Sequence, residues 1–237
     1  KILSANIYDV AIESPLHIAP FLSERMGNNI WVKREDKQPV YSFKIRGAYN
    51  KVLQLTDKEK AAGVVAASAG NHAQGLALAS RELGIKATIV MPLTTPEIKV
   101  KSCKAFGAKV ILHGDTFDEA FAYSQNLVEE KGFTYIHPYD DPEVIAGQGT
   151  IGMEILRQLS GPIDAIFVPV GGGGIIAGIA AYVKFLRPEI KIIGVESTES
   201  ACLQAALAAG RRVKLPSVGI FADGVAVAQI GKNTWDI

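Results

Sequence analysis

The chain has 237 residues, of which 48% are hydrophobic, and a formal net charge of +1. This length allows a well-buried core in one large domain or two small ones. Because no block of like charge occurs, we expect neither a nucleic-acid partner nor a membrane-surface partner. Two cysteines, Cys103 and Cys202, fit buried packing in a reducing compartment better than a disulfide framework, which indicates a cytoplasmic protein.

Short apolar runs rich in β-branched residues alternate with longer segments of helical period. Strands are predicted at residues 30–33, 63–66, 87–91, 109–112, 134–136, 165–170 and 191–195, with a last strand-like signal before Gly219. Helices are predicted at residues 44–55, 71–83, 96–106, 117–131, 144–159, 174–186 and 201–209, and residues 224–237 lead into a further helix. This alternation predicts parallel sheets covered by helices, the α/β class. Strands buried on both faces read as continuous apolar runs, as these do.

Lys44 lies in the run Ser42-Phe43-Lys44-Ile45-Arg46-Gly47-Ala48, at the start of a predicted helix. A lysine that bonds to a carbonyl group must lose its proton near neutral pH, and burial or a nearby cation promotes that loss. Taken alone, the residue is better explained as an ordinary surface lysine. Its surroundings and two further motifs change that interpretation.

The second motif, Ser68-Ala69-Gly70-Asn71-His72, follows a predicted strand and opens a helix. Exposed amides at a helix N-terminus bind anions, and a substrate carboxylate is one. Gly70 lets the backbone approach a ligand closely, and the Asn71 amide can donate to an ionised oxygen. The simpler interpretation is that Ser68 or Asn71 caps the helix.

The third motif is the run Gly171-Gly172-Gly173-Gly174, which lies between a strand and an apolar helix. The backbone amides of four residues that lack side chains, together with the amide of Ile175, form a phosphate-binding turn. This run and Pro169 also interrupt the uncharged segment 165–183, which is therefore better explained as strand, turn and helix than as a membrane span. The sequence also matches a dinucleotide fingerprint, with Glu196 at the position of the ribose-binding acid, so a nicotinamide dinucleotide-binding domain stays an alternative.

Together the three motifs resemble the threonine dehydratases (threonine ammonia-lyases), in the tryptophan synthase β-like group of fold type II pyridoxal phosphate enzymes. The resemblance covers nearly the whole chain. It implies pyridoxal 5'-phosphate as cofactor and an amino acid as substrate. The implied reaction is the β-elimination of water from L-threonine to give 2-oxobutanoate and ammonia, the first step of isoleucine biosynthesis, with L-serine as a second substrate. A homo-oligomer is expected.

The resemblance also implies a role for each motif. Lys44 would hold the cofactor as an imine and move the α-proton of the substrate. The residues implied to bind the cofactor are Phe43, Lys44, Asn71, Gly171, Gly172, Gly173, Gly174 and Ile175. The residues implied to bind the substrate are Ser68, Ala69, Gly70, Asn71 and His72.

Position 69 separates elimination from racemisation. In the related serine racemases a second serine occupies this position and serves the opposite face of the substrate. Ala69 has no proton to give, which favours elimination. A serine racemase or serine dehydratase of the same family stays the alternative, since the preference for serine over threonine depends on one methyl group.

We expect no metal site. Some relatives bind a divalent cation through a glutamate at position 196, a carbonyl near Ser200 and a carboxylate at position 202. Cys202 replaces that carboxylate, and hard cations prefer oxygen ligands. Glu196 is therefore predicted to cap the next helix, and the four histidines show no metal-binding spacing.

By resemblance, residues 1–65 and 142–237 form a larger domain, and residues 66–141 form a smaller domain set into it. The second part of the larger domain is expected to be incomplete at the C-terminus. The family places a serine, in a late Ser-Gly-x-Asn segment, against the pyridine nitrogen, and no such segment occurs before Ile237. In the segment Gly147-Gln148-Gly149-Thr150, the glycines predict either close packing against cofactor or substrate, or a softened helix start.

Overall fold

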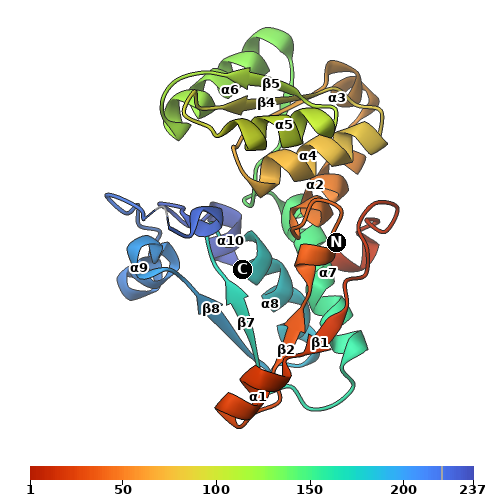
Figure 1. Ribbon diagram of the computed structural model, residues 1–237, viewed down its shortest axis with the longest axis vertical. Helices are drawn as coiled ribbons and strands as arrows, with labels where there is room; N and C mark the ends of the chain where they lie inside the picture. The colour runs from red at the N-terminus through yellow and green to blue at the C-terminus, as the bar shows by residue number, and fades with distance from the viewer. Residues whose placement is uncertain (220) are drawn as a thin grey trace.

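In the computed structural model, which describes residues 1–219 and 221–237, the chain folds into two lobes (Figure 1). The upper lobe holds a parallel sheet of four strands in the order β5-β4-β3-β6. These strands are β3 (Val64–Ala67), β4 (Ala87–Met91), β5 (Lys109–Leu112) and β6 (Thr134–Tyr135). The helices of this lobe are α3 (Asp57–Ala62), α4 (Asn71–Glu82), α5 (Glu97–Ala105) and α6 (Phe117–Lys131).

Helices cover both faces of this sheet, which explains why its two central strands are apolar throughout. Val64 and Ala66 pack with Leu76 of α4 on one face. Val65 and Val90 face the other way, in a cluster with Leu127 of α6. All of β3 and β4 is buried, so their carboxyl ends are held at a fixed edge of the sheet.

The lower lobe contains a second parallel pair, β7 (Ala165–Pro169) and β8 (Lys191–Val195). An antiparallel pair, β1 (Leu16–Ile18) and β2 (Trp31–Lys33), belongs to the same lobe (Figure 1). The helices of this lobe are α1 (Pro20–Met26), α2 (Lys44–Leu53), α7 (Pro142–Gln158), α8 (Gly174–Leu186), α9 (Cys202–Ala209) and α10 (Lys232–Asp236).

Helix α7 packs between α2 and α8 at very short range, and glycines make this possible. A Cβ at Gly147 would lie 2.6 Å from the Arg46 carbonyl oxygen on α2. A Cβ at Gly149 would lie 2.9 Å from the Gly178 carbonyl oxygen on α8. The prediction that these glycines soften a helix start is wrong, because they lie within α7 and allow its neighbours to approach. The result is a fixed spacing between the helices that carry Lys44 and the glycine run. The predicted contact of Gly147 and Gly149 with cofactor or substrate stays a prediction.

The predicted α/β class with parallel sheets is confirmed, and the predicted ranges of α6 and α8 match the observed bounds. Helices α1 and α3 and strand β1 were not predicted. The strand predicted before Gly219 is wrong, since residues 211–219 form no strand. Both cysteines are buried free thiols. Within the described ranges, every helix is too short or too polar to cross a membrane. The division at residues 65/66 and 141/142 stays a prediction.

Candidate active site

Lys44 is the first residue of α2, and its partly buried side chain reaches the segment between β6 and α7. Its Nζ donates a hydrogen bond to the Pro138 carbonyl at 2.8 Å and lies 5.4 Å from the centre of the Phe43 ring. A carbonyl and an aromatic face replace little of the hydration that an ammonium loses. Burial therefore lowers the pKa of Lys44 to about 8, so that a far larger share of the amine is neutral near physiological pH than for a hydrated lysine.

The Ser68–Asn71 turn joins the carboxyl end of β3 to the N-terminus of α4. Gly70 is the N-cap of α4, and no side chain caps the helix, so the interpretation of Ser68 or Asn71 as a cap is wrong. Ser68 Oγ accepts a hydrogen bond from the Gly70 amide at 3.2 Å. Asn71 is exposed, and Ser68, Ala69 and Gly70 are partly exposed. Within the described ranges the amides of Asn71 and His72 have no protein acceptor.

His72 differs from the rest of this motif, because its side chain is buried. Its Nε2 lies 2.8 Å from the Ile136 carbonyl, which can only accept, so Nε2 carries the proton. Burial, and then the charge of Lys44, lower the pKa of His72 to about 3. The imidazole is therefore neutral and ties α4 to the end of β6. Only its backbone amide is available to a substrate.

The glycine run follows β7 and opens α8, with Gly173 in the left-handed conformation at φ 94° as the N-cap. Its carbonyls are bound within the protein: Thr234 Oγ1 and the Gly231 amide donate to Gly172 O, and the Ala177 amide donates to Gly173 O. In contrast, no amide from residue 171 to residue 175 has an acceptor within residues 1–219 and 221–237. Gly172, Gly173 and Gly174 are buried. Buried N–H groups without acceptors destabilise a fold unless a bound ligand supplies the acceptors.

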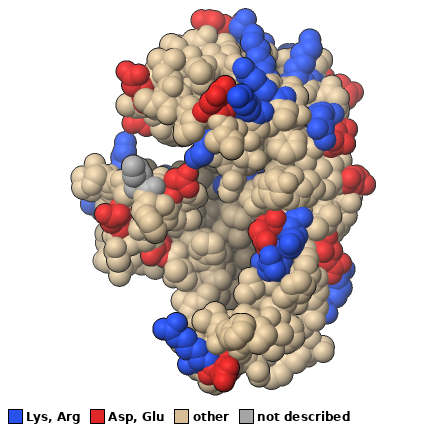
Figure 2. Space-filling view, viewed as in Figure 1, with Lys and Arg blue, Asp and Glu red and all other residues tan. Residues whose placement is uncertain are grey.

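Short contacts join the three motifs into one site. A Cβ at Gly75 of α4 would lie 3.0 Å from the carbonyl carbon of Lys44, so α4 and the first turn of α2 are in direct contact. Beyond the lysine, the segment that contains Pro138 continues to Tyr139. The Tyr139 ring lies directly over Gly172. Figure 2 shows this face of the molecule hollowed between the two lobes.

Comparison with known proteins assigns the family. Residues 7–237 match the family model described as "Pyridoxal-phosphate dependent enzyme". The chain belongs to this family. A curated relative, "Threonine dehydratase 1 biosynthetic, chloroplastic" of Solanum lycopersicum, is 59% identical over 99% of this chain and 39% of its own length. The chain thus spans about two fifths of that relative, and the resemblance inferred from the motifs is confirmed.

Solved structures agree with the family assignment. The processed form of threonine deaminase isoform 2 from Solanum lycopersicum superposes with a TM-score of 0.97 at 56% identity, over 99% of this chain and 64% of that one. Maize serine racemase superposes with a TM-score of 0.95 at 35% identity, over 99% of this chain and 71% of that one. The fold type II assignment is therefore confirmed as well.

The residues of the site fit the cofactor of this family. Pyridoxal phosphate needs a lysine amine that can lose its proton near neutral pH and a set of donors for a phosphate group. Lys44 has the lowered pKa, and the amides of residues 171–175 are the free donors. A side chain at Gly172 or Gly174 would collide with Tyr139, and one at Gly173 would meet Ile230 from a left-handed backbone, which explains why these three positions are glycines.

Glu196 has the role predicted for it. Its two carboxylate oxygens accept hydrogen bonds from the Leu203 and Gln204 amides in the first turn of α9, at 2.8 and 2.9 Å. A glutamate used in this way is not available to a ribose, which counts against the dinucleotide alternative. Over the described part of the chain, no three His, Cys, Asp or Glu side chains gather as a metal site would require.

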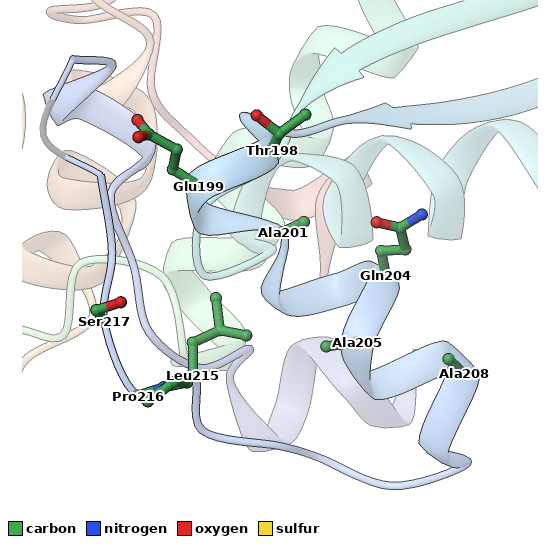
Figure 3. Close-up of a pocket in the computed structure, with 9 residues that line it drawn as sticks. All are labelled: Thr198, Glu199, Ala201, Gln204, Ala205, Ala208, Leu215, Pro216 and Ser217. Carbon is green, nitrogen blue, oxygen red and sulfur yellow. The ribbon is translucent and has the colours of Figure 1, made fainter.

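The prediction from sequence missed Pro138 and Tyr139. Their position in the sequence could have indicated them, because both follow the strand β6. This strand lies next to β3 in the sheet, and the carboxyl ends of parallel strands meet at one edge. A surface pocket of about 590 Å³ lies elsewhere, against α9 (Figure 3). Thr198, Gln204 and Leu215 line it, and it contains none of the predicted site residues.

Proposed function

We propose that this chain catalyses the pyridoxal phosphate-dependent elimination of water from L-threonine, giving 2-oxobutanoate and ammonia as the first step of isoleucine biosynthesis. The observation that carries the proposal is the combination of Lys44, with its pKa of about 8, and the free amides of the glycine run. The names of the tomato relatives support L-threonine as the substrate, and L-serine is the second substrate that we propose.

Each motif has a distinct task in this proposal. The amides of residues 171–175 bind the phosphate group, and Lys44 Nζ forms the covalent link. Phe43 packs beside the lysine, and Asn71 donates to an ionised oxygen of the ring. When bound, pyridoxal phosphate supplies the electron sink that stabilises negative charge at the substrate Cα.

The substrate is held by the Ser68–Asn71 turn. The free amides of Asn71 and His72 bind the α-carboxylate at the N-terminus of α4, where the helix dipole favours an anion. Once the substrate amine has displaced it, Lys44 Nζ, which its pKa of about 8 leaves partly neutral, would remove the α-proton, and the lysine ammonium so formed would supply the proton with which the β-hydroxyl leaves as water.

Ala69 supports elimination rather than racemisation. Its methyl group packs against the core of the upper lobe, next to β3, and carries no acid or base. The opposite face of the substrate therefore lacks the proton donor that racemisation needs.

A product assay tests the proposed reaction. With pyridoxal phosphate present, L-threonine should yield 2-oxobutanoate. From L-serine, pyruvate should form faster than D-serine forms. The Ala69→Ser variant should gain D-serine formation relative to pyruvate. If the chain released no keto acid, or formed D-serine as fast as pyruvate, the proposal would be wrong.

Three further properties belong to the proposal: the cellular location, the oligomeric state and the domain division. The free thiols Cys103 and Cys202 support the cytoplasm as the location, although the name of the tomato relative records a chloroplast. Exposed apolar side chains such as Phe185, which is 85% exposed, support a homo-oligomer, and sedimentation velocity tests this. The single four-stranded sheet within residues 64–135 supports the small domain at 66–141, which limited proteolysis tests.

A further inference from the structure

A four-residue strap, His137–Asp140, lies within the connection from β6 to α7 and contacts the candidate site. The His137 ring fixes its shape: Nδ1 accepts hydrogen bonds from the Tyr139 and Asp140 amides at 3.3 and 2.8 Å. The Tyr139 ring packs edge to face on the His137 ring, with centroids 4.6 Å apart and an interplanar angle of 89°. The strap is therefore a rigid turn.

Two consecutive strap residues contact the two halves of the site. The Pro138 carbonyl accepts the hydrogen bond from Lys44 Nζ at 2.8 Å. The Tyr139 ring occupies the space that a side chain at Gly172 would need, and the Tyr139 Cβ lies 3.0 Å, and its Cα and carbonyl oxygen 3.1 Å, from the Cβ position of Gly174. One peptide unit thus separates the contact with the lysine from the contact with the glycine run.

The next residue, Asp140, is linked to the same glycine run through α10. Its carboxylate accepts hydrogen bonds from the Lys232 and Asn233 amides at 2.8 and 2.7 Å, which holds α10 in place. From α10, Thr234 Oγ1 donates to the Gly172 carbonyl at 2.8 Å. Gly172 is therefore held at its carbonyl by α10 and at its Cα by Tyr139.

We infer that Tyr139 is a positioning residue, whose ring sets the distance between the glycine amides and Lys44 Nζ. This inference rests on the proposed function, since it concerns a ligand that uses both groups at once. A ligand that bonds to the lysine and places a phosphate group in the turn gains affinity only when both contacts fit together. Tyr139 is partly buried, and burial raises the pKa of its phenol to about 12, so the ring acts as a neutral spacer.

Comparison of pyridoxal phosphate with pyridoxal isolates this role, because pyridoxal can bond to Lys44 but has no phosphate group. Tyr139→Ala should weaken the affinity for pyridoxal phosphate by about tenfold or more and change that for pyridoxal by less than about twofold. Tyr139→Phe is the matched control and should bind both like the wild type, since the phenol oxygen makes only a 3.5 Å contact with Gln229 O.

A second pair of variants tests the contact itself. Gly172→Ala should lose pyridoxal phosphate binding, because its new methyl group meets the Tyr139 ring. The double variant, Gly172→Ala with Tyr139→Ala, should bind pyridoxal phosphate about tenfold more tightly than Gly172→Ala alone, because the obstructing ring is gone.

The outcomes separate this inference from the proposed function. If wild-type Lys44 bonded neither aldehyde, the proposed function would fail first. If the wild type bound both, the inference about Tyr139 alone would be overturned by any of three results: an unchanged pyridoxal phosphate affinity in Tyr139→Ala, an equal loss for pyridoxal, or no recovery in the double variant.

Discussion

Two polar regions lie at the two ends of the same short sequence, Lys44 to Arg46, and they differ in how their donors are used. The Arg46 cluster comprises Arg46, Glu35, Glu154, Lys33 and Tyr8. Arg46 and Glu154 are fully buried. Arg46 Nε donates to Glu35, its Nη1 donates to Glu154 at 2.5 Å and to Thr150, and its Nη2 donates to Glu35, Glu154 and the Ile12 carbonyl.

The other partners of Glu154 complete the cluster. Lys33 forms an ion pair with it at 2.6 Å, and the Tyr8 hydroxyl donates to it at 2.7 Å. Burial alone would raise the pKa of Glu154, but these hydrogen bonds and the charge of Arg46 hold it below its usual value. No nitrogen of Arg46 remains for a ligand, so the cluster stabilises the fold by tying α2 to α7.

The glycine run and Lys44 show the opposite arrangement. Within the described ranges, the amides of residues 171–175 have no acceptor, and Lys44 Nζ has one carbonyl partner and no carboxylate. Gly172, Gly173 and Gly174 are buried, as are Arg46 and Glu154, so burial alone does not identify the site. The state of the donors does: saturated donors indicate a structural role, and unsatisfied ones indicate a ligand.

The largest effect expected from this comparison is that of Lys44→Ala. Turnover of L-threonine should fall by more than about 10³-fold, because the variant lacks both the covalent link and the base. The free energy of unfolding should change by less than about 1 kcal/mol, since one hydrogen bond to a carbonyl is lost. Lys58→Ala, at an exposed position on α3, is the control and should leave both unchanged. A large loss of stability in Lys44→Ala would place this lysine with the structural cluster.

Glu154→Ala should, in contrast to Lys44→Ala, mainly lower the stability of the fold. It leaves Arg46 and Lys33 without their shared carboxylate and should lower the free energy of unfolding by about 3–5 kcal/mol, measured by urea denaturation. Glu189→Ala removes an exposed ion pair with Arg187 and should cost about 0–1 kcal/mol. Equal effects of the two substitutions would contradict the structural role of the cluster.

The pH dependence of cofactor attachment tests the environment of Lys44. Only the neutral amine attacks an aldehyde, so the rate should rise with pH and reach half of its maximum near the pKa of about 8. At that pH a lysine with the ordinary pKa of 10.5 is less than about 1% neutral. Stopped-flow absorption of added pyridoxal phosphate measures the rate, with N-acetyl-lysine as the control amine. A midpoint above pH 10 would show that Lys44 is hydrated like a surface lysine.

The smallest effect concerns Glu196. Like the Arg46 cluster, its carboxylate is satisfied by hydrogen bonds within the protein, although it has only two of them. Glu196→Ala removes two hydrogen bonds to the first turn of α9 and should lower the free energy of unfolding by about 1 kcal/mol. Glu196→Gln keeps one acceptor and should lose less. Thermal denaturation with added Ca²⁺ or Mg²⁺ checks the alternative, since a rise in Tm that depends on Glu196 would indicate a metal ligand.

Local patterns predicted most of the fold from sequence. The run of β-branched residues at 87–91 matches β4, and Thr116 with Glu119 forms the capping box before α6. The same signal at Thr56 and Glu59 begins α3, which was not predicted because the helix is only six residues long. Strand β1 was missed because three residues give too short a pattern, and only its pairing with β2 makes it a strand.

The candidate site could be predicted in part. Lys44, the Ser68–Asn71 turn and the glycine run each have a local signature, so their positions at strand and helix ends followed from sequence. Pro138 contributes its backbone carbonyl, which every residue type has, so the residue type at this position does not reveal the contact. Tyr139 matters through its contact with Gly172, which forms only when the two lobes meet. The buried side chain of His72 was also missed, because burial at one position of a helix depends on the neighbouring sheet.

The most direct test of the central claim is to find which lysine bonds the cofactor. The protein is incubated with pyridoxal phosphate, reduced with borohydride, digested and mapped by mass spectrometry. We predict that the reduced adduct lies on Lys44 and is absent from the Lys44→Ala variant. An adduct on a different lysine, or none on the wild type, would contradict the assignment of this region as the active site.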